Sequence, residues 1–153
     1  MRITVISDLH TKHGSIPKED SPGGDLIICA GDIMNSGYNK NDIWDFCHWY
    51  QSLDQYEDKV FIAGNHDKSF DPKFNDEISK PEWLQDELAA LPSSIIYLEN
   101  SYTTIDGIKI WGSPITPWFH GDRWAFNKQR GFDISCLIHN LIDFILRIKF
   151  IPF

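Results

Sequence analysis

The stretch Lys59-Val60-Phe61-Ile62-Ala63-Gly64-Asn65-His66-Asp67 joins a short apolar run to a cluster of small and polar residues. Short apolar runs that end at glycine are typical of strands buried on both faces of a sheet. Two earlier stretches have the same form: Arg2–Ser7 leads into Asp8-Leu9-His10, and Asp25–Ala30 leads into Gly31-Asp32. The three stretches predict neighbouring strands, each followed at its carboxyl end by polar side chains.

The segments around these strands predict an α/β fold class. Between the second and third strands, Asn41–Leu53 has apolar residues at helical spacing, and Asn41 is the expected N-cap. Strand, helix, strand is the pattern of a parallel pair. A second helix is predicted over Pro81–Leu91 and a further strand over Ile95–Leu98. Asp106-Gly107, between two β-rich runs, predicts a tight hairpin.

Composition narrows the functional classes. The chain has 153 residues, of which 42% are hydrophobic, and a formal net charge of −8, which suits one globular domain. The net negative charge argues against non-specific binding to nucleic acid or to an anionic membrane, because either kind of binding needs a basic protein surface. The sequence contains no run of about 20 apolar residues, so no membrane span is predicted. Three cysteines without C-x-x-C spacing predict no disulfide framework, and we expect a cytoplasmic setting.

The polar clusters contain residues suited to metal binding. Asp8 and His10 stand two positions apart in an extended segment and therefore project to the same side. Asp32 arrives from the neighbouring strand end, and its two carboxylate oxygens can bridge two cations. Asn65 offers a carbonyl oxygen. This mixture of carboxylate, imidazole and amide ligands predicts a hard or borderline divalent metal beyond the strand ends.

Two residues in the same region are candidates for proton transfer. His66 follows Asn65 directly and, in an extended stretch, faces differently from it. We therefore predict that His66 is a general acid for a leaving alkoxide, and that Asp67 orients its imidazole. Asp-x-His or Gly-Asp alone is common in proteins and carries little weight, whereas all three motifs in this order favour a functional site.

With these motifs in place, the sequence resembles the calcineurin-like metallophosphoesterase superfamily, whose pattern is D-x-H, then G-D, then G-N-H-[D/E]. Later segments, Gly112-Ser113-Pro114, Pro117-Trp118-Phe119 and Trp124-Ala125-Phe126-Asn127, are similar to the subgroup that includes MPPED-type phosphodiesterases. The resemblance covers residues 1 to about 131. It implies a β-sandwich of two sheets flanked by helices, in α-β-β-α layers, with a dinuclear metal site between strand ends.

The resemblance also implies a role for each matched residue. Asp8 and His10 would bind the first metal, Asp32 would bridge both, and Asn65 would bind the second. His66 would stabilise the transition state or protonate the leaving group. The metals would be Mn, Fe, Zn or Ni, and a metal-bound hydroxide would attack a phosphomonoester or phosphodiester.

The substrate is open at this stage. Nucleotides are suggested by the subgroup resemblance. The aromatic residues near the later motifs would either stack on a nucleobase or simply pack a long loop; they are Trp111, Trp118, Phe119, Trp124 and Phe126.

The sequence departs from the family pattern in its later part. Three further histidine ligands come from T-H-G-P-P-like and G-H-x-H segments in the family, and neither segment is present in this sequence. We therefore expect weak or single metal binding. The alternative function is a non-catalytic remnant or a metal- or phosphate-binding module.

The final segment has a different composition. Phe132–Phe153 carries 14 apolar residues in 22, so we divide the chain into residues 1–131, the N-terminal part of a metallophosphoesterase domain, and an apolar, helical tail over residues 132–153. A change of reading frame or a cut gene would explain this division, and a genuine short variant is the alternative. The tail is expected to pack on the core or to bind a partner helix.

Overall fold

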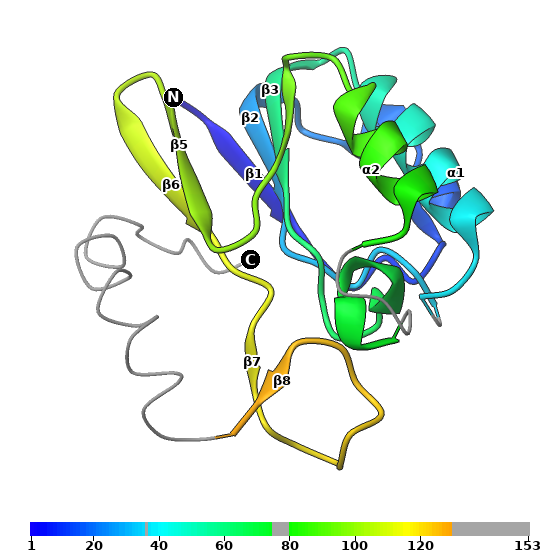
Figure 1. Ribbon diagram of the computed structural model, residues 1–153. Coiled ribbons are helices and arrows are strands. Elements are labelled where there is room, and N and C mark those ends of the chain that lie inside the picture. Colours follow the sequence, from blue (N-terminus) through cyan, green and yellow to red (C-terminus); the bar gives the residue numbers. More distant parts are fainter. Residues whose placement is uncertain (36, 75–79, 130–153) are drawn as a thin grey trace.

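The computed structural model describes residues 1–35, 37–74 and 80–129, and its centre is a parallel sheet (Figure 1). The sheet has the order β1-β2-β3-β4, and all three strand pairs are parallel. Its strands are β1 (Ile3–Ile6), β2 (Gly24–Cys29), β3 (Tyr56–Phe61) and β4 (Ile95–Tyr97). The predicted α/β class and the parallel pairing are therefore confirmed.

The remaining elements surround this sheet. The two α-helices are α1 (Lys40–Gln51) and α2 (Glu82–Ala89). An antiparallel hairpin is formed by β5 (Ser101–Ile105) and β6 (Ile108–Gly112), and two short strands pair as β7 (Thr116–Pro117) and β8 (Asn127–Lys128). Single turns of 3-10 helix cover His13–Ser15, Lys18–Asp20, Lys68–Phe70 and Pro72–Phe74.

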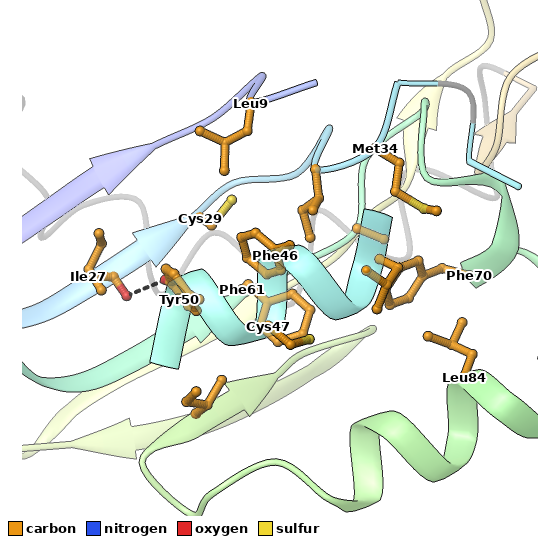
Figure 2. Packing of buried hydrophobic residues seen from close by; sticks show 14 of the residues in the cluster. Leu9, Ile27, Cys29, Met34, Phe46, Cys47, Tyr50, Phe61, Phe70 and Leu84 are labelled. Atoms are coloured by element: carbon orange, nitrogen blue, oxygen red, sulfur yellow. Dashed lines mark hydrogen bonds between the residues drawn. The ribbon is translucent and has the colours of Figure 1, made fainter. Parts of the chain in front are cut away.

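The main hydrophobic core lies between the sheet and the helices (Figure 2). Phe46 of α1 stacks on Tyr50 at 4.9 Å between ring centroids and meets Phe61 of β3 edge-on at 5.4 Å. The buried Tyr50 hydroxyl lies 3.0 Å from the carbonyl oxygen of Ile27 and 2.8 Å from that of Val60, so its proton can be donated to either strand. Burial of these large rings is the main source of stability on this side.

A second core lies on the opposite face of the sheet, where the hairpin packs. Leu26, Val60 and Leu98 from this face contact Ile105 and Ile110 of the hairpin. The described residues therefore form three layers in the order helices, sheet, hairpin, with α1 and α2 on one side of the sheet and β5–β6 on the other (Figure 1). This order agrees with part of the predicted α-β-β-α sandwich. An outer helical layer over the hairpin does not occur in the part of the chain that the structure describes.

Local predictions are confirmed with two corrections. Asp106 and Gly107 both have positive φ, 48° and 76°, as a two-residue hairpin turn requires. The N-cap of α1 is Asn39 rather than Asn41, because the Asn39 side chain accepts a hydrogen bond from the Asn41 backbone at 3.1 Å. The edge strand β1 is also not buried on both faces, since Val5 is 58% exposed. The predicted tail over residues 132–153 lies outside the described residues.

His13 leads to a prediction about pH. It is buried against the rings of Phe46 and Trp49, and burial lowers the pKa of its imidazole, while Asp45 and Asp42 oppose the shift. An unfolded histidine titrates near pH 6.5, so the unfolded chain binds this proton more readily than the folded chain. The stability that the neutral ring contributes is present above about pH 6.5 and is lost as the pH falls below it.

Urea unfolding of the metal-free protein between pH 5 and 8 measures this effect. The free energy of unfolding should fall more steeply on acidification in the parent than in His13→Leu, which carries no titrating group there. Parallel curves for the two proteins would show that His13 is not the responsible group.

Candidate metal centre

The loops that follow β1 and β2 run side by side at one edge of the sheet. The Asp8 amide donates to the Gly31 carbonyl at 3.1 Å, and the His10 amide donates to the Asp32 carbonyl at 3.0 Å. Asp8, His10 and Asp32 all have positive φ, at 56°, 43° and 54°. Non-glycine residues rarely adopt this conformation, and they are concentrated at functional sites where the surrounding structure holds the strain.

These loops bring together three side chains that could hold a metal ion. The ligand atoms of His10, Asp32 and His66 all lie within 4.8 Å of one another. Bonds of about 2.1 Å around a tetrahedral or octahedral ion separate the ligands by about 3–4 Å, so small side-chain rotations would close this group around a cation. The buried Nδ1 of His10 has no hydrogen-bond partner among the described residues, which fits a ligand without its ion.

A cleft of about 310 Å³ adjoins this group. One wall comes from the strand ends and includes Asp8, Asp32 and Asn65, and the other is the segment Ser113–Thr116. Asp32 thus belongs both to the cluster with His10 and His66 and to the wall with Asp8 and Asn65. The structure brings all four predicted metal ligands to one edge of the sheet, and Asp32 is the residue that the two groups share.

Glycine residues allow the loops after β2 and β3 to approach each other closely. A Cβ atom at Gly64 would overlap both the carboxylate and the backbone nitrogen of Asp32, and one at Gly31 would lie 2.9 Å from the Gly64 Cα. The loops after β2 and β3 therefore touch backbone to backbone. Any larger side chain at Gly64 would displace Asp32 from the site.

The predicted role of Asp67 as the partner of the His66 imidazole is wrong. The Asp67 carboxylate is fully buried and accepts hydrogen bonds from the backbone amides of Ile33 at 3.2 Å, Met34 at 2.7 Å and Gly64 at 2.7 Å. Burial raises the pKa of this carboxyl to about 7, although the three amide donors oppose the shift. Asp67 therefore ties the loop after β3 to the loop after β2.

His66 is oriented by a different residue, Asn35, whose carbonyl oxygen lies 2.7 Å from the imidazole Nδ1. Because a carbonyl only accepts, Nδ1 carries the proton and Nε2 is left for a metal or a substrate. The His66 amide also donates to the Asp32 carboxylate at 2.9 Å. Nothing in the sequence pattern marks Asn35, because its role depends on how the loop after β2 folds back.

Trp124 forms the outer boundary of the site. Its ring centroid lies 4.5 Å from that of His66, and Phe119 stacks on the Trp124 ring at 6.1 Å and an interplanar angle of 13°. The loop is anchored because the Ala125 amide donates to the Asn65 carbonyl at 3.0 Å. Of the five predicted aromatic residues, Phe119 and Trp124 lie beside the site, while Phe126 is buried in the main core.

The other described histidines do not join the site. His13 is buried against α1, His48 contacts the Trp44 carbonyl on the exposed side of the same helix, and His120 is exposed. Within the described ranges, none of the helices is long and apolar enough to cross a membrane.

A parallel sheet whose first three strands end in Asp-x-His, Gly-Asp and Gly-Asn-His-Asp at one edge is typical of a metallophosphoesterase-type fold. Comparison with known proteins agrees, because residues 1–140 match the calcineurin-like phosphoesterase family. The chain belongs to this family. The match continues past residue 131, so the division placed there from composition remains a prediction.

Relatives with curated names support the same assignment. The chain is 34% identical over 142 residues to metallophosphoesterase domain-containing protein 1 of Homo sapiens and of Mus musculus, covering 85% of this chain and 41% of each relative. A UPF0046 protein of Caenorhabditis elegans is 32% identical over 149 residues, covering 86% of this chain and 36% of the relative. The chain therefore spans less than half the length of these relatives.

The contact between Gly64 and Asp32 predicts that Gly64→Ala lowers affinity for Mn²⁺ by at least about tenfold, because the new methyl group displaces a ligand. Titration calorimetry measures the affinity. Gly14→Ala is the matched control, since a Cβ there has no atom within 4 Å. Equal affinities in the two variants would contradict the proposed crowding.

The hydrogen bonds of Asp67 predict that Asp67→Asn destabilises the fold. An amide NH₂ would replace one acceptor oxygen and leave a buried donor facing backbone donors, which costs about 1–3 kcal/mol. Urea unfolding of the metal-free protein at pH 8, where the parent carboxyl is mostly charged, measures the difference. If Asp67 mattered only for orienting His66, the free energy of unfolding would be unchanged.

Proposed function

We propose that this chain forms a divalent-metal-dependent phosphoesterase centre that hydrolyses phosphomonoesters or phosphodiesters. The convergence of His10, Asp32 and His66 within 4.8 Å, at the carboxyl ends of the parallel strands, carries the proposal, in which His10 and Asp32 would bind metal and His66 would be the proton donor beside them. Family membership supports the reaction class, and the adjoining cleft of about 310 Å³ leaves room for a phosphate ester.

Asp32 is shared by the cluster and the cleft wall, and this supports the ligand roles that the family resemblance implies. Asp8 and His10 would hold one cation, Asn65 would hold a second, and Asp32 would contribute to both. Bound cations supply positive charge for the phosphate oxygens and a nucleophile at neutral pH. The crowded glycines Gly31 and Gly64 keep the Asp32 carboxylate in place.

His66 donates the proton that the leaving group needs. Its Nδ1 is fixed by the Asn35 carbonyl at 2.7 Å, so the ring presents Nε2 toward the cluster. A ring protonated at both nitrogens can then deliver the Nε2 proton to the departing oxygen. The ring of Trp124 at 4.5 Å limits the rotation of the imidazole and screens one side of it from water.

A second candidate function is a module that binds a metal or phosphate without turnover. It is favoured by the group of His10, Asp32 and His66, because three side chains within 4.8 Å of one another suffice to hold one ion. Such a module would keep the cluster of His10, Asp32 and His66 but would hold a single ion with open coordination positions.

Asp32→Asn tests the site. Loss of the bridging charge should lower Mn²⁺ affinity by more than about 100-fold and reduce hydrolysis of p-nitrophenyl phosphate and bis(p-nitrophenyl) phosphate to background. Calorimetry measures metal binding, and absorbance of nitrophenolate measures turnover. Asp86→Asn, on an exposed position of α2, is the control for loss of one carboxylate.

The parent and the variant together distinguish the two functions. Metal-dependent turnover that disappears in Asp32→Asn supports the phosphoesterase. Metal binding by the parent without turnover of either ester favours the binding module. Undiminished hydrolysis in Asp32→Asn would show that the metal site is assigned to the wrong residues.

A further inference from the structure

Lys68 occupies an unusual position beside the metal centre. Its ammonium nitrogen lies over three aromatic rings, at 5.1 Å from the centroid of Tyr38, 5.6 Å from Phe74 and 5.8 Å from Trp124. No carboxylate pairs with it among the described residues. By contrast, Lys73 has the Asp122 carboxylate at 3.8 Å. The charge of Lys68 is therefore held against ring faces, and no acid among residues 1–35, 37–74 and 80–129 neutralises it.

The backbone fixes this cation relative to His66. The Lys68 amide donates to the His66 carbonyl at 3.0 Å, and Lys68 begins a 3-10 turn. A Cβ atom at Gly37 would overlap both the Lys68 nitrogen and the His66 carbonyl oxygen, so the loop bearing Tyr38 packs directly on this turn. His66 and Lys68 also share one neighbour, because both lie against the Trp124 ring.

Building on the phosphoesterase function proposed above, we propose that Lys68 binds a second anionic group of the substrate, on the leaving-group side of the metal centre. The cations of the centre neutralise the phosphate that reacts. A further negative charge on the substrate would meet a chain whose net charge is −8, and Lys68 provides a positive group beside His66. Tyr38 is 57% exposed, so the cluster is open to a ligand from solvent.

The aromatic surroundings define what kind of leaving group suits this position. Rings of Tyr38, Phe74 and Trp124 lie around the ammonium group, so three aromatic faces border this position. An aromatic leaving group that carries a carboxylate or phosphate therefore matches both features, since its ring contacts the aromatic side chains and its charge meets Lys68.

Two non-hydrolysable ligands that differ by one carboxylate test the assignment: phenylphosphonate and 4-carboxyphenylphosphonate. Calorimetry on the full chain with Mn²⁺ should show about threefold to fivefold tighter binding of the carboxylated ligand, as expected for one partly exposed charge pair. Lys68→Met, which keeps the stem but removes the charge, should abolish the difference in affinity between the two ligands. Lys68→Arg should retain it.

Lys109→Met is the matched control, because Lys109 also lies over an aromatic ring, 3.9 Å from the Tyr102 centroid, but on the hairpin. Equal affinity of the parent for both ligands, no binding of either, or a preference that persists in Lys68→Met would overturn the proposal. These titrations need no turnover. A chain that shows the preference but hydrolyses neither nitrophenyl ester would fail the proposed function and keep the Lys68 site.

Discussion

The buried carboxylate of Asp67 is the contact on which the arrangement of the candidate metal centre depends. Its two oxygens accept hydrogen bonds from the amides of Ile33, Met34 and Gly64, and thereby join the loops that follow β2 and β3. The hydrogen bond from the His66 amide to the Asp32 carboxylate, at 2.9 Å, joins the same two loops nearer the surface. Since burying a carboxylate is costly unless backbone donors surround it, the carboxylate and the loop conformations require each other.

The sheet and its two cores provide the rigid support for that contact. Parallel strands deliver their carboxyl ends to one edge, and Tyr50 and Phe61 pack α1 firmly against the sheet behind it. The strained residues Asp8, His10 and Asp32 can then remain in the left-handed region, because the backbone bonds between their loops hold them there. In this way the apolar core, far from the chemistry, sets the positions of the ligand atoms.

The sequence predicts the positions of some residues of the candidate centre but not of others. Asp8, His10, Asp32 and Asn65 follow β-rich runs directly, so their convergence could be predicted from the rule that parallel strands end at the same edge. The role of Asp67 could not be predicted. Its position next to His66 suggested that the two side chains interact, whereas the Asp67 carboxylate points into the protein interior. Asn35 and Trp124 act on His66 from distant segments, and no local pattern marks such contacts.

The sequence by itself determined the α/β class, the parallel strands, the hairpin and the identity of the ligand-bearing motifs, because each depends on short-range periodicity or on a few neighbouring residues. Only the tertiary structure decided which group orients His66, why Gly64 must lack a side chain, and which aromatic rings surround the charge of Lys68. The physical reason is that these features depend on contacts between loops separated by about 30 residues or more, such as His66 with Asn35, at which the sequence separation is 31. Packing of the sheet and core brings those loops together.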